Sequence, residues 1–99
     1  MRPIHVAHLD KARPVLVLTR EVVRVHMSTV TIAPITSTIR GLSTEVQVGA
    51  ANGLDQPSVV ACDHVTTIPA RALGAQIGLL LDDQEPVLSD AIRAAFDLD

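Results

Sequence analysis

The feature that most limits the fold of this chain is a run of β-branched residues that ends in a row of hydroxyls. Within TVTIAPITSTIRG, residues 29–41, Val30 and Ile32 alternate with threonines at a period near two. This pattern predicts a half-buried strand, because β-branched side chains suit a pleated surface that rests on a core. The apolar run stops at Thr36, the first of three consecutive hydroxyl residues.

The polar end of this strand has two interpretations. Thr36, Ser37 and Thr38 are followed closely by Arg40. Hydroxyl donors beside an arginine fork suit a phosphate or another oxyanion. The alternative is a strand end whose hydroxyls bond the local backbone. Residue chemistry alone leaves both interpretations open.

Shorter strand-like segments lie on both sides of this run. We expect strands at residues 4–9, 13–18, 44–48, 58–61, 65–68 and 75–81. The polar and basic residues 19–28 predict an exposed loop. Residues 49–57 predict a turn, and residues 69–73 predict a single helical turn.

The C-terminal segment predicts a helix. Asp82 is expected to cap it, with Glu85 three residues later and Pro86 in or next to the first turn. Apolar residues then recur at helical spacing: Val87, Leu88, Ala91, Ile92, Ala95 and Phe96. Such a stripe, with Phe96 packed in it, indicates a core face or a dimer seam.

These elements predict an α+β fold in one domain over residues 1–99. The expected architecture is a small, mostly antiparallel SH3-like β-barrel with a C-terminal helix. Hydrophobic residues make up 47% of the chain, yet only one residue is aromatic. The core is therefore expected to consist of valine, isoleucine, leucine and alanine.

The chain has a net charge of −3, and its charged residues are unevenly distributed along the sequence. Residues 1–81 hold seven basic and five acidic side chains, whereas residues 82–99 hold one basic and six acidic side chains. A mildly basic body can therefore meet RNA while the acidic helix faces away. The single cysteine, Cys62, excludes an intramolecular disulfide, and no apolar run reaches the length of a membrane span. With no visible signal peptide, these features predict a cytoplasmic protein.

Three blocks in the chain resemble the MazF/PemK family of toxin endoribonucleases, and most of all its mycobacterial branch. They are RPVLVLTRE at residues 13–21, TVTIAPITSTIRGLSTEV at residues 29–46 and PSVVACD at residues 57–63. The resemblance implies a CcdB/MazF-type barrel that forms a homodimer and acts as the toxin of a type II toxin–antitoxin system. It also implies sequence-specific cleavage of single-stranded RNA, whether mRNA or loops of rRNA or tRNA, which inhibits translation and growth. The products would carry 2′,3′-cyclic phosphate and 5′-hydroxyl ends, no metal or other cofactor would take part, and a MazE-type antitoxin would block the RNA groove.

The resemblance assigns catalysis to Arg13, in the RPV block, and to Thr36, at the end of the third strand. An arginine fork suits the charge that develops on the phosphoryl oxygens, and a threonine hydroxyl adds one donor. Because arginine loses its proton only above a pKa of about 12, we expect electrostatic stabilisation before proton transfer. Without the resemblance, a surface arginine held in a salt bridge beside a strand is the simpler explanation of Arg13.

Other residues are candidate RNA contacts, and an exposed turn or loop explains them equally well. They are Ser37, Thr38, Arg40, Arg20, Arg24 and His64. His64 stands where family members usually carry glutamine. The family's long loop before the RPV arginine is reduced here to residues 10–12, so the RNA preference of relatives cannot be carried over.

Alternative chemistries receive less support from the sequence. Four histidines allow an acid–base pair, but His5 and His8 are three residues apart on one expected strand and should face opposite ways. No histidine or cysteine spacing matches a metal site, and Cys62 is expected to be a buried apolar residue. Two other functions remain possible: a CcdB-like gyrase poison, although the tail AFDLD lacks that family's ending, and a non-catalytic SH3-like interaction module.

Overall fold

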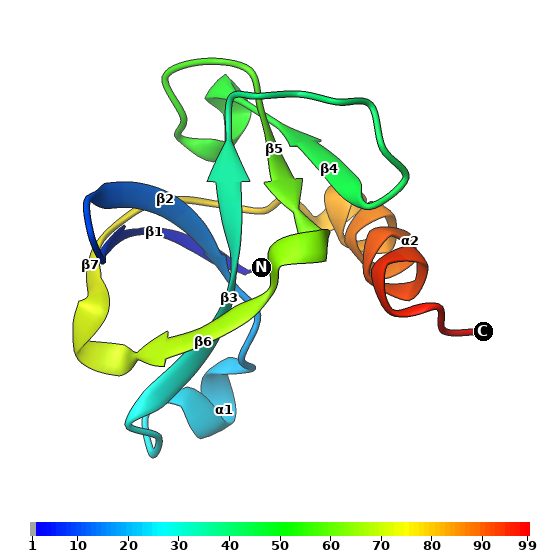
Figure 1. The fold of residues 1–99 in the computed structure, drawn as a ribbon. Coiled ribbons are helices and arrows are strands. Elements are labelled where there is room, and N and C mark those ends of the chain that lie inside the picture. The colour runs from blue at the N-terminus through cyan, green and yellow to red at the C-terminus, as the bar shows by residue number, and fades with distance from the viewer. Residues whose placement is uncertain (1) are drawn as a thin grey trace.

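The β-branched run forms β3 (Thr29–Thr36), which lies at the centre of a curled antiparallel sheet (Figure 1). The computed structural model describes residues 2–99. One edge of β3 pairs with β2 (Ala12–Val17). The other edge pairs first with β6 (Thr66–Pro69) and then, nearer its C-terminal end, with β5 (Ser58–Ala61).

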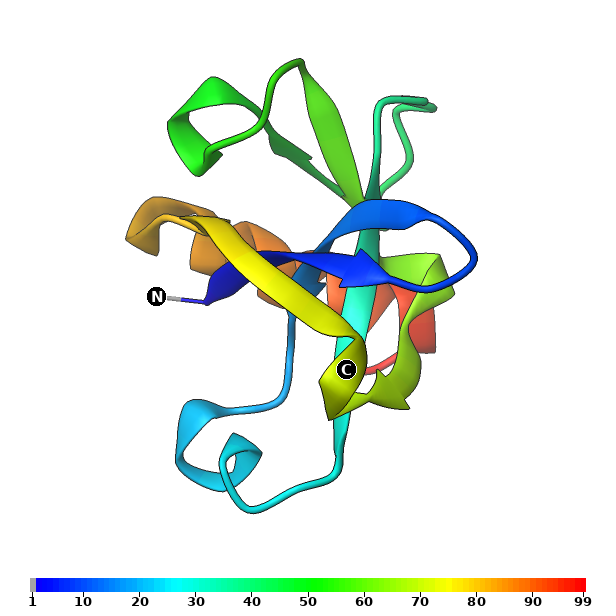
Figure 2. The same cartoon turned by 90° about the vertical axis from the view of Figure 1, so that its left-hand side faces the viewer.

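The remaining strands extend this sheet on both sides. β4 (Glu45–Val48) pairs with β5, while β1 (Pro3–His8) lies between β2 and β7 (Leu73–Leu79). The sheet is strongly curled and forms a half-barrel, as Figures 1 and 2 show. This architecture confirms the predicted α+β class, and each predicted strand lies within two residues of its predicted bounds.

Short helical turns connect the strands. The predicted turn at residues 69–73 is confirmed by the 3₁₀ turn η3 (Ala70–Ala72). The segment predicted as an exposed loop contains one short helix, α1 (Glu21–Arg24). Two further 3₁₀ turns are important for the site, η1 (Ala50–Asn52) and η2 (Cys62–His64).

The C-terminal helix α2 (Glu85–Phe96) is present, but its predicted cap is wrong. Asp82 begins a 3₁₀ turn, η4 (Asp82–Gln84), and the side-chain oxygen of Gln84 accepts the Leu81 amide at 2.8 Å. Glu85 instead pairs with the guanidinium of Arg2 at 2.8 Å. Within residues 2–99, no helix is long and apolar enough to cross a membrane.

The apolar face of α2 covers one side of the sheet. Leu88 and Ala91 are buried against a core cluster that includes Ala33 and Ile35 of β3. The prediction that Phe96 packs in this stripe is wrong, because its side chain is 54% exposed. Phe96 follows Leu88 by eight residues, which places it about 80° around the helix from the buried line.

A second, smaller core cluster lies on the opposite face of β3. Val30 and Ile32 belong to it, together with Val15, Val17 and Ile68. Since alternate residues of a strand share a face, Pro34 and Thr36 continue this same line beyond the end of the cluster. The candidate site therefore begins where the second core stops.

A buried polar residue, Asn52, ties η1 to the rest of the fold. Its side chain is almost fully buried, and its Nδ2 donates to the Leu79 carbonyl at 2.9 Å and to Gln84 Oε1 at 2.7 Å. Its Oδ1 accepts the Gly49 amide at 3.1 Å. These bonds link a loop, a strand and the start of α2.

The backbone after Asn52 lies directly against β7. A Cβ atom built on Gly78 would lie 1.7 Å from the Asn52 carbonyl oxygen, and one on Gly53 would lie 2.0 Å from the Ile77 oxygen. Gly53 also has a positive φ of 84°, which favours glycine. This contact fixes the segment that follows, residues 53–56.

We expect Asn52→Ala to lower the free energy of unfolding by about 1–3 kcal/mol, because it leaves buried backbone groups without partners. Urea denaturation measures this loss. Ser89→Ala, on the exposed side of α2, is the control and should stay within about 0.5 kcal/mol of the parent. Equal stability of the two variants would contradict the anchoring role of Asn52.

Candidate active site

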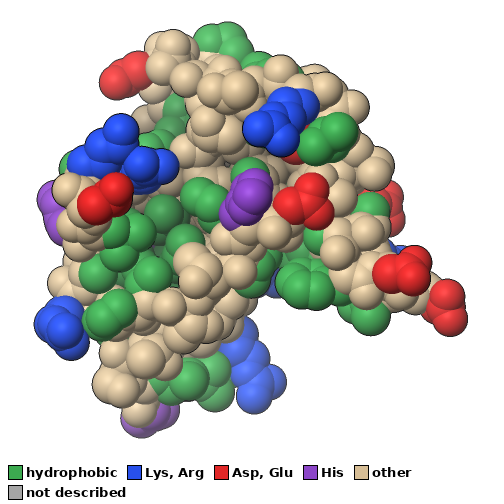
Figure 3. Space-filling model, viewed as in Figure 1, with side chains coloured by type: hydrophobic (Ala, Val, Ile, Leu, Met, Phe, Trp, Pro, Cys, Tyr) green, Lys and Arg blue, Asp and Glu red, His purple; other side chains and the backbone are tan. Residues whose placement is uncertain are grey.

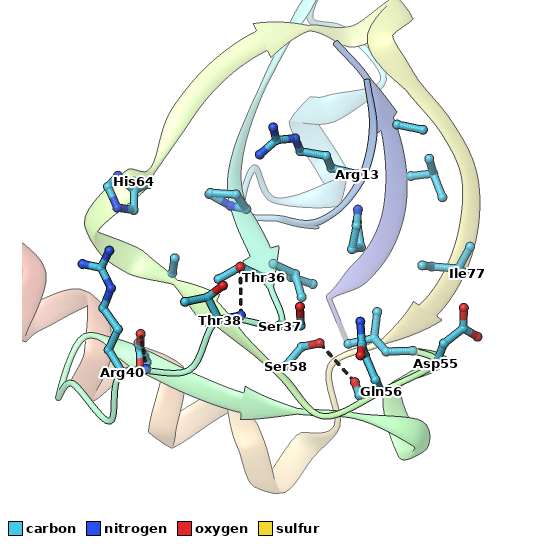
Figure 4. Close-up of a pocket in the computed structure, with 18 of the residues that line it drawn as sticks. Arg13, Thr36, Ser37, Thr38, Arg40, Asp55, Gln56, Ser58, His64 and Ile77 are labelled. Carbon is cyan, nitrogen blue, oxygen red and sulfur yellow. Dashed lines mark hydrogen bonds between the residues drawn. The ribbon is translucent and has the colours of Figure 1, made fainter. Parts of the chain in front are cut away.

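The pairing of β2 with β3 brings Arg13 and Thr36 together. Val15 is paired with Pro34, and Arg13 and Thr36 lie two residues beyond this last pair on β2 and β3. Because alternate residues of a strand share a face, Arg13 lies on the face of Val15 and Thr36 on the face of Pro34. Both side chains line one groove, as Figure 4 shows.

This groove has a volume of about 1050 Å³ and opens on the face seen in Figure 3. Its walls come from the β1–β2 connection, the end of β3 with the following loop, η2, and the segment after η1. The polar and charged side chains that line it include Lys11, Arg13, Thr36, Ser37, Thr38, Arg40, Thr44, Asp55, Gln56, Ser58, Asp63 and His64. Basic groups thus come from two separate parts of the chain.

Thr36 is half-buried, and its hydroxyl oxygen accepts the Thr38 amide at 3.1 Å. The interpretation of this strand end as a backbone-bonded terminus is therefore partly correct. The bond uses a lone pair and leaves the hydroxyl proton available as a donor. The same bond holds the Thr36 oxygen in place at the groove.

Arg13 has a largely free guanidinium. Its nearest carboxylate is that of Asp10, with Nη2 and Oδ2 3.9 Å apart, and the two side chains are 47% and 78% exposed. A contact this long and this exposed contributes little. Arg13 is therefore not held by a strong surface salt bridge, and its donors can bind an anion.

Other candidate residues divide into two groups. Ser37, Thr38, Arg40 and His64 line the same groove as Arg13. The structure does not bring Arg20 and Arg24 there, because α1 lies at the far end of β3 (Figure 1). Arg20 instead lines a separate surface hollow with Arg2, Glu21, Asp82 and Glu85.

Several groove residues were not among those predicted from the sequence. Lys11 is two residues from Arg13 in the shortened connection, and that proximity was a usable signal. Asp55, Gln56 and Ser58 reach the groove because η1 is fixed against β7, which no local pattern indicates. Their position is a consequence of tertiary packing.

The histidines do not assemble into a pair at the groove. His5 lies in β1, where its Nδ1 is 3.0 Å from the Gly74 carbonyl oxygen. His8 also lies beside Gly74, and neither His8 nor His26 lines the groove. Among residues 2–99, no group of three histidine, cysteine, aspartate or glutamate side chains is placed to hold a metal ion.

Cys62 is fully buried in the core beside α2. Burial, together with the nearby Asp63 carboxylate, raises the pKa of its thiol from 9.0 to about 11. At neutral pH the group is therefore an uncharged thiol, which is a poor nucleophile. This confirms the prediction that Cys62 is a buried apolar residue.

Comparison with known proteins adds family relationships to this geometry. The family described as PemK-like, MazF-like toxin of type II toxin–antitoxin system matches residues 3–96. A Mycobacterium tuberculosis H37Rv protein named Endoribonuclease MazF3 is 69% identical over 99 residues, which are 100% of this chain and 96% of the relative. Another protein of that strain, Probable endoribonuclease MazF5, is 31% identical over 86 residues, covering 86% of this chain and 79% of the relative.

Solved structures show the same fold. The Mycobacterium tuberculosis toxin MazF-mt6 superposes with a TM-score of 0.97 at 68% identity and covers 99% of both chains. A mycobacterial endoribonuclease in complex with its cognate antitoxin superposes with a TM-score of 0.87 at 22% identity, covering 98% of this chain and 93% of the other. The second likeness, at this low identity, concerns the fold alone.

We expect the Cys62 thiol to react slowly with a disulfide reagent such as DTNB near pH 8, since a rise of two pKa units lowers the thiolate fraction about 100-fold. The rate of DTNB labelling in the folded protein should be at least 100-fold lower than in the protein unfolded by guanidinium chloride. Free cysteine, labelled in the same two solutions, is the control for the effect of the denaturant on the reagent. The raised pKa of Cys62 contributes stability to the folded state at pH values below 9.0, and this contribution is lost as the pH rises towards about 11. Rapid labelling of the folded protein would contradict the burial of Cys62.

Proposed function

The chain belongs to the PemK-like, MazF-like family of toxins of type II toxin–antitoxin systems. On that premise we propose that it cleaves RNA and that Arg13 and Thr36 are its catalytic residues. The observation that carries this proposal is that one groove is lined both by a largely free guanidinium, Arg13, and by a hydroxyl group, Thr36, whose oxygen is held by a backbone amide. The similarity to a protein named Endoribonuclease MazF3, at 69% identity over the whole chain, supports the same activity.

The reaction we propose needs no external nucleophile. The ribose 2′-oxygen attacks the adjacent phosphorus, a new O2′–P bond forms, and the P–O5′ bond breaks. The 2′-hydroxyl gives up one proton and the leaving 5′-oxygen gains one, which leaves a 2′,3′-cyclic phosphate and a 5′-hydroxyl. The transition state carries additional charge on the phosphoryl oxygens, which preorganised donors stabilise.

The two residues divide this task. Arg13 offers a planar set of donors to the phosphoryl oxygens and balances their charge. The Thr36 hydroxyl donates a hydrogen bond to the phosphate while its oxygen continues to accept the Thr38 amide. Because arginine holds its proton up to a pKa of about 12, Arg13 acts by electrostatic stabilisation, and water in the open groove carries the transferred protons.

Recognition of RNA rests on hydrogen bonds and groove shape in this proposal. Single-stranded RNA is often held by stacking on aromatic side chains. The only aromatic residue of the chain, Phe96, is on α2 and does not line the groove. Ser37, Thr38, Arg40 and His64 are the groove residues that we assign to contacts with RNA beyond the scissile phosphate.

The biological setting of the proposal follows from the family. The toxin acts in the cytoplasm as a homodimer, cuts mRNA or loops of stable RNA at short sequences, and so inhibits translation and growth. A MazE-type antitoxin neutralises it by covering the RNA groove. Solved relatives of the same fold include one described as a complex with its cognate antitoxin.

We expect Arg13→Ala and Thr36→Val each to lower the rate of RNA cleavage by at least about 10²-fold, since each removes one preorganised donor. Thr36→Ser keeps the hydroxyl and should retain much of the activity. Arg93→Ala removes an arginine on the exposed side of α2, away from the groove, and is the control. A rate close to the parent value in either of the first two variants, with folding checked by circular dichroism, would remove that residue from the proposed mechanism.

We also expect the purified protein to cut RNA in excess EDTA with no other protein present. The 5′ ends should be 5′-hydroxyls, which polynucleotide kinase labels without prior phosphatase treatment. An RNA with a 2′-deoxy nucleotide at the scissile position should resist cleavage, because it lacks the nucleophile. Loss of cleavage in EDTA, or 5′-phosphate ends, would require a different mechanism, and no cleavage at all would favour a gyrase poison or a binding module.

A further inference from the structure

Glu45, at the start of β4, holds the loop that follows β3. Its carboxylate accepts three consecutive backbone amides: Gly41 at 2.9 Å, Leu42 at 3.1 Å and Arg40 at 3.2 Å. The second carboxylate oxygen lies 3.4 Å from the Arg40 amide. A charged acceptor shared by three amides holds the loop strongly, because hydrogen bonds to ionised groups are stronger than those between neutral groups.

The loop would otherwise have little to hold it. Residues 37–44 contain no helix or strand, and the side chains of residues 37–43 are exposed. Gly41, with a φ of 74°, makes the turn that directs successive amides to one point. The Glu45 carboxylate therefore sets the path of the backbone from the end of β3 to the start of β4.

This arrangement leaves the Arg40 side chain free. Glu45 contacts Arg40 through the backbone amide, and the ion pairs within 4.0 Å in the described part of the chain involve Arg2 and Arg13 but not Arg40. Figure 4 shows the Arg40 side chain extending from the loop towards the side of the groove where His64 lies. Glu45 thus fixes the loop that carries Arg40, while the Arg40 guanidinium forms no ion pair within 4.0 Å among residues 2–99.

The positions of the basic residues suggest what Arg40 binds. Lys11, in the β1–β2 connection, and Arg13, near the start of β2, both line the groove. Figure 4 shows Arg40 across the groove from Arg13. Besides Glu45, whose carboxylate binds the loop amides, Asp63 lines the groove near His64, and its carboxylate accepts the Thr44 hydroxyl at 2.6 Å. A strand of RNA with one phosphate at Arg13 would therefore find a second cation, Arg40, across the groove.

We propose that Glu45 is a positioning residue that fixes the loop so that Arg40 binds a phosphate next to the scissile one. This inference rests on the proposed function, because it deepens the account of the same groove. It predicts that the effect of Glu45 on RNA binding is exerted through Arg40. If Glu45 merely stabilises the fold, its effect should not depend on Arg40.

A double-mutant cycle on Arg40→Ala and Glu45→Ala tests this coupling. Binding is measured with an RNA oligonucleotide that the parent cleaves, made uncleavable by a 2′-deoxy nucleotide at the scissile position. Arg40→Ala should raise the Kd about tenfold, as expected for loss of one charge-assisted contact, and should reduce the slope of log Kd against log salt by about 0.7. Glu45→Ala should weaken binding in the parent background and add little in the Arg40→Ala background.

A conservative variant and an RNA-independent measurement complete the test. Glu45→Gln keeps an oxygen acceptor and should restore most of the affinity. Amide hydrogen exchange should show protection at residues 40–42 in the parent and in Glu45→Gln, and loss of that protection in Glu45→Ala. With cleavable RNA, Arg40→Ala should change KM more than kcat.

Three results would overturn the inference. One is an unchanged Kd and salt slope in Arg40→Ala, a measurement that does not depend on the folding of any Glu45 variant. Another is an equal effect of Glu45→Ala in both backgrounds, and the third is unchanged amide exchange at residues 40–42. Cleavage by the parent under the same conditions keeps these results separate from a failure of the proposed function.

Discussion

The change of partner along one edge of β3 determines where the site lies. Residues 29–32 pair with β6 and residues 35–36 pair with β5, so the edge is interrupted at Ala33 and Pro34. Pro34 lacks an amide hydrogen and suits a position where this edge has no partner. The chain leaves the sheet there as η2, which carries His64 to the groove. The opposite edge is paired with β2 across this interruption, from Ile32 to Pro34, and Arg13 and Thr36 follow just beyond that pairing at the groove.

The two faces of β3 lie against different parts of the molecule. Ala33 and Ile35 face the core that α2 covers, whereas Pro34 and Thr36 face the groove. The helix and its preceding turn carry most of the acidic residues of the segment 82–99, so these charges lie on the side of β3 that faces α2 and not on the side that faces the groove. A net charge of −3 is therefore compatible with a polyanionic substrate, because local rather than total charge acts on a bound strand.

The sequence predicted those elements that depend on local patterns. Strand β3 and the apolar face of α2 followed from periods of two and 3.6 residues. The cap at Asp82 and the burial of Phe96 failed, because both depend on how α2 meets the sheet. The pairing of Arg13 with Thr36 came from family resemblance, since 22 intervening residues carry no signal of contact. Glu45 resembled an ordinary polar position on an alternating strand, and only the turned loop reveals what its carboxylate binds.

The walls of the groove share one means of support. Thr36 accepts the Thr38 amide, Glu45 accepts the amides of residues 40–42, and Asn52 holds the turn that leads to Asp55 and Gln56. Each anchor is a side-chain acceptor bonded to the backbone, so the groove is shaped before any ligand arrives. Preorganised donors need little rearrangement during reaction, and a short β1–β2 connection leaves no long lid to close over the strand. For the RNA site that we propose, discrimination among RNA sequences therefore depends on the fixed walls of the groove, and the three anchors contribute to it by holding those walls in place.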